Sequence, residues 1–350
     1  MPSAPPAACD VFFYEAFAEE AERLLHYAAA TGLRVGHSPL TIQETGHAAP
    51  PAPVVSLRTQ SVLPPIWAPQ LRGILSRSTG YDHLNAYREA VGAAAPALGY
   101  LPLYCVRAVA EQAMLLWTAL LRRLPRQLAE FDRFRRDHLT GRENPGKKMA
   151  LFGVGNIGHE IWKIAGALGI EVRGVDPVRR HPDVAYVAPA EALADADLVV
   201  CAMNLTPRNR GYFTRDVLAL AKRRPLLVNV ARGEFTPAAV LEAALEEGLL
   251  SGVALDVFNE EATLAPALRS GNPAALTPDN QALLRLRQRP DVLLTPHNAF
   301  NTAEAVERKS EQSVRALLHF RQTGQFPWPV PDECFPGRGQ PLRIKNRFNS

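Results

Sequence analysis

The chain has few of the features that mark disulfide-stabilised or metal-bound proteins. Only four of its 350 residues are cysteine, and Cys9, Cys105, Cys201 and Cys334 lie far apart and match no metal-ligand spacing. We therefore expect free thiols in a reducing cytoplasm, with no disulfide framework and no metal site.

Long apolar runs and an excess of one charge are also missing. No uninterrupted apolar segment approaches the roughly 20 residues that span a membrane. Residues 1–9 lack the basic segment and apolar core of a signal peptide. The net charge of +4 is small and scattered, which argues against a nucleic-acid partner. With 47% hydrophobic and 21% charged residues, the composition is that of a soluble globular protein long enough for two domains.

The middle of the chain contains a glycine-rich turn between a predicted strand and a predicted helix. Residues 150–158 read ALFGVGNIG. Gly153 allows a tight turn, Gly155 lets the backbone approach a pyrophosphate, and Gly158 lets the helix pack closely on the strand. The helix N-terminus offers N–H groups and a positive dipole end to phosphates. We predict a dinucleotide site that includes these glycines together with Asn156 and Ile157.

The acidic residue Asp176 predicts which dinucleotide binds. It ends the next predicted strand, residues 170–175, roughly twenty residues after the glycines. A carboxylate at this position accepts hydrogen bonds from the ribose hydroxyls of NAD and repels the 2′-phosphate of NADP. Arg179 and Arg180 follow closely and weaken the discrimination, because arginines can bind that phosphate. We predict NAD as the cofactor.

Strands and helices alternate along the chain, which predicts an α/β fold with a parallel, doubly wound sheet. After the glycine turn, the predicted strands cover residues 197–203, 226–230, 252–256 and 292–295. Before it, residues 11–14, 54–57 and 71–75 predict strands of a smaller α/β unit, and residues 106–123 predict a connecting helix. We expect Thr236 to cap a later helix, with Pro237 as its first residue.

Three of these predicted strands are followed by residues that can do chemistry. Arg232 follows one, Glu260 and Glu261 follow the second, and His297 follows the third. Ligands of such sheets bind at the carboxyl ends of the strands, where these side chains would meet. An arginine can grip a substrate carboxylate, and a histidine can protonate a carbonyl oxygen that gains charge from a hydride. A neighbouring carboxylate, for which we choose Glu261, favours the charged imidazolium.

Four motifs resemble those of the D-isomer specific 2-hydroxyacid dehydrogenases: GVGNIG at 153–158, NVARG at 229–233, LDVFNEE at 255–261 and TPHNA at 295–299. The resemblance implies a cytoplasmic, NAD-dependent enzyme that interconverts a 2-oxoacid and a D-2-hydroxyacid. It also implies a homodimer built through the cofactor domains. The residues that it marks as catalytic are Arg232, Glu261 and His297, and those that it adds as cofactor contacts are Val230, Ala231 and Asp256.

The resemblance also implies where the substrate binds. Residues 77–82 resemble the substrate loop of the family, with Thr79 and Gly80 offering amides to the carboxylate. From the residues alone, this segment would be interpreted as an ordinary turn. Tyr104 is expected near the pocket, as is Phe300. Phe300 and the long segment 262–290 favour the D-lactate dehydrogenase-like branch and a small, pyruvate-like substrate.

The implied architecture is two Rossmann-like domains. A discontinuous, flavodoxin-like substrate domain comprises residues 1–104 and 300–335, the NAD-binding domain comprises 105–299, and 336–350 form a C-terminal tail. The chain re-enters the first domain through a helix that Asn301 is expected to cap, with Glu304 three residues on. Two alternatives stay open. One is a glycerate, phosphoglycerate or phosphite dehydrogenase of the same family, and the other is a non-enzymatic NAD(H)-sensing corepressor.

Overall fold

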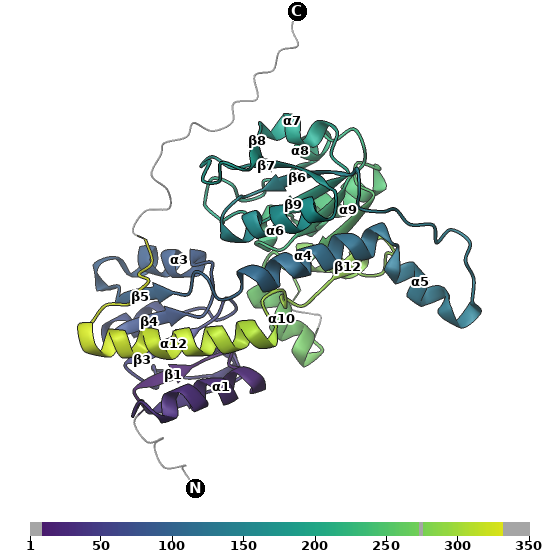
Figure 1. The fold of residues 1–350 in the computed structure, drawn as a ribbon. Helices are drawn as coiled ribbons and strands as arrows, with labels where there is room; N and C mark the ends of the chain where they lie inside the picture. Colours follow the sequence, from purple (N-terminus) through teal and green to yellow (C-terminus); the bar gives the residue numbers. More distant parts are fainter. Residues whose placement is uncertain (1–8, 273–275, 332–350) are drawn as a thin grey trace, which may run out of the picture.

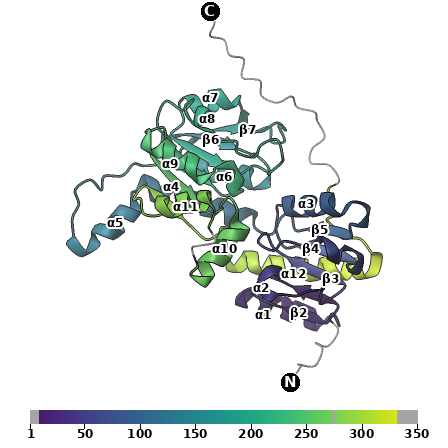
Figure 2. The ribbon, with the colours of Figure 1, turned by 180° about the vertical axis from the view of Figure 1, so that it is seen from behind.

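The computed structural model describes residues 9–272 and 276–331 of the chain, which form two parallel sheets with helices packed around them. Figures 1 and 2 show the two sheets as separate bodies connected by helix α4. The tail predicted at residues 336–350 and Cys334 lie outside the described residues. Within the described ranges, no helix is both long and apolar enough to cross a membrane.

The N-terminal sheet has five parallel strands in the order β2-β1-β3-β4-β5, which is the flavodoxin order. Its strands are β1 (Val11–Phe13), β2 (Val35–His37), β3 (Val54–Leu57), β4 (Gly73–Ser76) and β5 (Ala97–Tyr100). The helices of this part are α1 (Ala18–Ala29), α2 (Ile42–Thr45) and α3 (Asp82–Val91). The predicted flavodoxin-like sheet is thus confirmed, and buried side chains fill both of its faces.

The second sheet has seven parallel strands in the order β12-β11-β10-β9-β6-β7-β8. Its strands are β6 (Lys148–Phe152), β7 (Glu171–Val175), β8 (Ala185–Tyr186), β9 (Leu198–Cys201), β10 (Leu226–Asn229), β11 (Gly252–Leu255) and β12 (Val292–Leu294). The helices around it are α6 (Asn156–Ala167), α7 (Pro189–Ala194), α8 (Arg215–Leu218), α9 (Ala238–Glu246), α10 (Glu261–Ser270) and α11 (Pro278–Leu286). The strand order reverses between β6 and β9. This point is where doubly wound sheets bind their ligands.

Two long helices connect the sheets. Helix α4 (Val106–Leu121) leaves the first sheet and packs against α6 of the second, burying Ala110, Ala113 and Trp117 completely. Helix α12 (Ala303–Thr323) returns the chain to the first sheet, where it lies beside α1 (Figure 1). The chain therefore crosses between the sheets twice. Helix α5 (Leu124–Glu130) follows α4 and projects away from both sheets (Figure 1).

The helix predicted to be capped by Thr236 begins later than expected. Helix α9 starts at Ala238, and the N-cap position belongs to Pro237, which has no side-chain oxygen. The Thr236 hydroxyl instead accepts a hydrogen bond of 2.8 Å from Asn229 Nδ2. Because its oxygen is used by the preceding strand end, Thr236 does not cap the helix.

The predicted cap of α12 is also wrong by one residue. Thr302 is the N-cap, and its Oγ1 accepts a hydrogen bond from Ala305 N at 3.2 Å. The side-chain amide of Asn301 donates to Asn298 Oδ1 at 3.0 Å. Asn301 therefore stabilises the turn before the helix rather than the helix itself.

Candidate active site

The glycine turn has the geometry that its three glycines predict. Gly153 has a φ of +88°, which favours glycine. A Cβ on Gly158 would lie 1.9 Å from the carbonyl oxygen of Gly153, so no side chain fits between turn and helix. A Cβ on Gly155 would meet nothing within 4 Å, so the space in front of it is open. Helix α6 starts at Asn156, directly behind that space, so the turn fits the pyrophosphate of a dinucleotide.

Asp176 lies beside this turn. One carboxylate oxygen accepts a hydrogen bond from Val154 N and the other accepts one from Val178 N, both at 2.8 Å. The carboxylate is thereby fixed between the glycine turn and the loop after β7. Arg179 and Arg180 are exposed on the same loop.

His297 and Glu261 form a hydrogen-bonded pair. His297 follows β12, and Glu261 is the first residue of α10, which follows β11. His297 Nδ1 lies 2.8 Å from each carboxylate oxygen of Glu261, and both side chains are largely buried. Glu260 turns away from the pair, and its carboxylate accepts a hydrogen bond from the Thr277 hydroxyl. Gln60, from the loop after β3, donates to Glu261 Oε1 at 2.9 Å.

The electrostatics of this pair keep Glu261 ionised. Burial alone would raise the pKa of its carboxyl, but the positive charge and hydrogen bond of His297 outweigh it. Hydrogen bonding from Gln60 and the charge of Arg232 act in the same direction, so the pKa of Glu261 lies below its ordinary value. With Nδ1 engaged by the carboxylate, the other ring nitrogen of His297 is left for a ligand in the cleft.

The fully buried Asp256 fixes the backbone that carries His297. Its carboxylate accepts hydrogen bonds from Asn298 N at 2.9 Å and Ala299 N at 2.8 Å, and from the Thr295 hydroxyl. Burial raises the pKa of Asp256 despite these bonds and the nearby charge of His297.

Arg232 follows β10 and reaches across to the first sheet. Its Nε donates to Asp82 Oδ1 at 2.9 Å, and its Nη1 donates to the Ala231 carbonyl at 2.9 Å. Its Nη2 is shielded from solvent and has no hydrogen-bond partner. Burial would raise the pKa of Asp82, but the Arg232 charge outweighs it and lowers that pKa. A Cβ on Gly80 would lie 1.8 Å from Nη2, so a side chain at this position would displace the guanidinium from the place it has here.

A cleft lies between the two sheets and opens to solvent. The predicted residues that line it are Thr79, Gly80, Tyr104, Ile157, Val230, Ala231, Arg232, Asp256, His297 and Phe300. Glu261 reaches it only through His297. The other predicted cofactor residues lie at the neighbouring glycine turn. The turn contains Gly153, Gly155, Asn156 and Gly158, and Asp176 lies beside it.

Comparison with known proteins identifies the family. Residues 113–299 match the family described as D-isomer specific 2-hydroxyacid dehydrogenase, NAD binding domain. The chain belongs to the D-isomer specific 2-hydroxyacid dehydrogenases. It is therefore an NAD-dependent oxidoreductase, as the sequence motifs predict.

Individual relatives of this dehydrogenase show the breadth of the family. The chain is 32% identical to 2-hydroxyacid dehydrogenase A of Aspergillus oryzae over 271 residues, 74% of each protein. It is 34% identical to D-3-phosphoglycerate dehydrogenase of Methanocaldococcus jannaschii over 205 residues, 56% of this chain and 36% of that protein. D-lactate dehydrogenase from Aquifex aeolicus, complexed with NAD and lactic acid, has the same fold with a TM-score of 0.79 at 24% identity. That match covers 90% of this chain and 96% of the Aquifex chain.

Three charged side chains are buried together next to Phe300 and Tyr104, and no sequence motif indicates them. Glu20 Oε1 pairs with Arg77 Nε at 2.7 Å and Lys309 Nζ at 2.9 Å, and all three side chains are fully buried. Burial would raise the pKa of Glu20, but the surrounding cations hold it at about 2. Lys309 shares that carboxylate with a second cation, so burial prevails and lowers its pKa to about 7.

Arg58 adds a further cation on the cleft side of these charges. It lines the cleft, its guanidinium carbon lies 3.8 Å from the ring centroid of Phe300, and its Nε is buried with no hydrogen-bond partner. Arg58 therefore brings a positive charge to the wall of the cleft near Phe300. Neither Arg58 nor Gln60 lies in a recognisable motif, whereas Asp82 ends the turn that the sequence singles out.

Proposed function

We propose that this dehydrogenase reduces a small, pyruvate-like 2-oxoacid to the D-2-hydroxyacid and runs the reaction in reverse when the hydroxyacid is in excess. The observation that supports it most is that Arg232 and the His297–Glu261 pair lie on one cleft, beside the turn at Thr79 and Gly80. Tyr104 and Phe300 are buried at the same cleft and limit the space for the substrate side chain.

Each residue has a role that follows from its contacts. NADH, when bound at the glycine turn, supplies the hydride. Arg232, which Asp82 holds in orientation, binds the substrate carboxylate through the guanidinium edge near Gly80. His297 donates a proton to the carbonyl oxygen as negative charge develops there, and Glu261 stabilises the imidazolium before that transfer. Asp256 keeps the loop that carries His297 in place.

The experiment is an NADH-oxidation assay against a panel of 2-oxoacids with small, branched, aromatic and anionic side chains, repeated with NADPH. We expect turnover of the small members with NADH. His297→Gln should lower kcat while NADH affinity, measured by nucleotide fluorescence, stays within about twofold of wild type. NADH binding without turnover of any member would contradict the proposal.

A second candidate substrate class is a 2-oxoacid or 2-hydroxyacid that carries another anionic group, as in phosphoglycerate. The cation Arg58 in the cleft wall favours it, because its buried Nε–H has no hydrogen-bond partner and can donate to an anionic group. The anionic members of the panel separate the two candidates. If Arg58→Leu lowers kcat/KM for these members and leaves kcat/KM for pyruvate unchanged, Arg58 binds the second anionic group of the substrate.

We further propose the domain limits and the assembly implied by the resemblance: a substrate domain of residues 1–104 and 300–335, a cofactor domain of 105–299, and a homodimer. Three large apolar side chains are exposed on α5 and just after it: Leu128 by 69%, Phe131 by 73% and Phe134 by 76%. Their exposure supports burial of residues 124–134 against a second copy. Analytical ultracentrifugation tests the dimer. The cytoplasmic location stays a prediction.

A further inference from the structure

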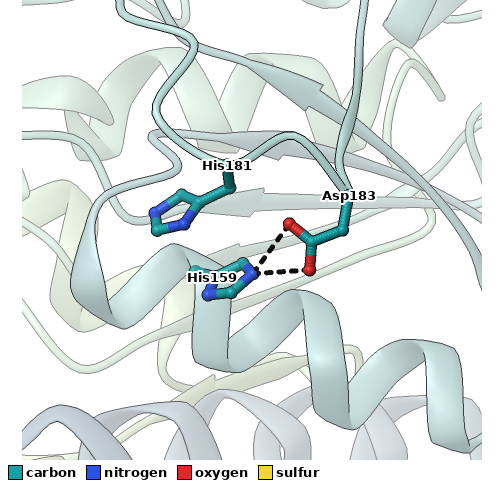
Figure 3. Close-up of side chains that lie close together, drawn as sticks. All are labelled: His159, His181 and Asp183. Carbon is teal, nitrogen blue, oxygen red and sulfur yellow. Dashed lines mark hydrogen bonds and ion pairs between the residues drawn. The ribbon is translucent and has the colours of Figure 1, made fainter.

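Three side chains that can ligate a metal gather beside the glycine turn (Figure 3). His159 lies in the first turn of α6, and His181 and Asp183 lie in the loop between β7 and β8. One ligand atom from each of the three lies within 4.8 Å of the others. His159 Nε2 is 3.0 Å and 3.2 Å from the two carboxylate oxygens of Asp183.

The cluster has a feature that its own contacts leave unexplained. His181 Nε2 is shielded from solvent and has no hydrogen-bond partner, although a polar atom in that position normally has one. This unpartnered ring nitrogen is an atom that can ligate a metal.

We propose that His159, His181 and Asp183 form a site for a divalent cation of the zinc class. Two imidazole nitrogens and one carboxylate oxygen suit Zn²⁺, whose sites use histidine and acidic ligands. With three protein ligands, a tetrahedral ion keeps one position for water. Hard cations such as Mg²⁺ are disfavoured, because they require oxygen ligands in octahedral geometry.

Binding requires a local rearrangement of the two imidazoles. Their rings are stacked with centroids 3.8 Å apart and planes 6° from parallel, so the lone pairs lie in separate parallel planes. One ring must turn about its side-chain torsions to direct a nitrogen at the same point as the other. His181 extends from a loop between two strands, whereas His159 is also stacked on Trp162 at 5.6 Å. His181 is therefore the ring that moves.

The position of the cluster gives the ion a structural effect. His159 comes directly after Gly158 in the glycine motif, and the loop of His181 and Asp183 starts just after Asp176. An ion bound here would crosslink the two segments that flank the predicted ribose site. It lies outside the cleft that contains Arg232 and His297. The proposal therefore does not depend on the substrate of the enzyme.

Isothermal titration of the metal-free full chain with ZnCl₂ tests the site. We expect one equivalent to bind to the wild type, and Mg²⁺ at the same concentration to give no signal. His181→Gln and Asp183→Asn should weaken that equivalent by about tenfold or more, since each removes a ligand. His26→Gln, which changes an exposed histidine on α1, is the matched control and should bind as the wild type does.

Thermal unfolding keeps the test valid if a substitution disturbs the loop. Zn²⁺ should raise the melting temperature of the wild type and His26→Gln but not of the two ligand variants, each compared with its own metal-free state. The proposal is overturned if the wild type binds no Zn²⁺, or if both ligand variants bind as tightly as His26→Gln. NADH oxidation is measured in parallel without metal, so loss of the site and failure of the proposed activity are separate results.

Discussion

Asp82→Asn tests how the structure orients Arg232 for a substrate carboxylate. The guanidinium is held at two points, by Asp82 Oδ1 at Nε and by the Ala231 carbonyl at Nη1. Asparagine keeps the shape of the side chain and one oxygen that can accept the hydrogen bond. The substitution therefore removes the charge of the pair and little else.

The size of the effect follows from the geometry of the pair. At 2.9 Å and an effective dielectric constant of about 20, the attraction between the two charges is about 6 kcal/mol, part of which offsets their desolvation. When one partner of a fully buried pair is removed, the free energy of unfolding falls by about 3–5 kcal/mol. Because 17% of the Arg232 side chain and 26% of the Asp82 side chain stay exposed, we expect a smaller loss of about 1.4–2.7 kcal/mol. A loss of the same size from transition-state binding lowers kcat/KM by about 10- to 100-fold.

Steady-state kinetics with the best 2-oxoacid of the panel measure this effect, with NADH affinity and melting temperature as companion readouts. The control is Asp216→Asn, which removes an exposed carboxylate on α8 and should leave all three unchanged. The reasoning is refuted if Asp82→Asn keeps kcat/KM within about twofold of wild type. It is also refuted if the loss is fully accounted for by weaker NADH binding.

Three further predictions concern the glycine turn, Asp176 and the His297–Glu261 pair. Gly158→Ala should abolish NADH binding, because the new Cβ would overlap the Gly153 carbonyl. The control is Gly166→Ala in the same helix, where the new Cβ meets no atom. It should raise the free energy of unfolding, measured by thermal unfolding, by about 0.5–1 kcal/mol. Asp176→Ala should raise kcat/KM with NADPH relative to NADH, and an unchanged ratio would mean that the carboxylate does not face the ribose. Glu261 has a lowered pKa, so it contributes stability above the unfolded carboxyl pKa that is lost as the pH falls through its folded value. The melting temperatures of wild type and Glu261→Gln should therefore differ most near neutral pH and converge in acid.

The parts of the site that the sequence predicts are those specified by short, contiguous segments. The three glycines act on one turn. The backbone geometry confirms a local reason for glycine at Gly153 and Gly158, and it leaves open space in front of Gly155. The strand ends carrying Arg232 and His297 could be located because buried strands of a parallel sheet are continuous apolar runs. Glu261 could be chosen because the LDVFNEE motif resembles that of the family, and the pairing of β11 with β12 then brings it to His297.

The rest of the site depends on partners that are distant in sequence. Asp82 is 150 residues from Arg232, and Gln60 is 201 residues from Glu261, so no local pattern connects them. For the same reason, the turn at Gly80 looks ordinary in the sequence, and its close contact with a guanidinium becomes visible only once the two sheets face each other. The predicted helix caps are wrong for a different reason. Thr302 takes the cap position of α12 in place of Asn301, and the Thr236 hydroxyl is occupied by Asn229, so other local contacts decide both helix starts.

The backbone around His297 shows that the fold maintains an unfavourable local conformation at this position. His297 has a φ of +51°, in the left-handed region that costs a residue with a Cβ about 1–2 kcal/mol. The next two backbone N–H groups both donate to Asp256, which has no solvent exposure and receives a third hydrogen bond from Thr295. These bonds fix the turn, and the turn directs the imidazole at Glu261. The left-handed turn and the buried Asp256 beside it support the proposal that His297 is catalytic, because together they hold its imidazole against Glu261.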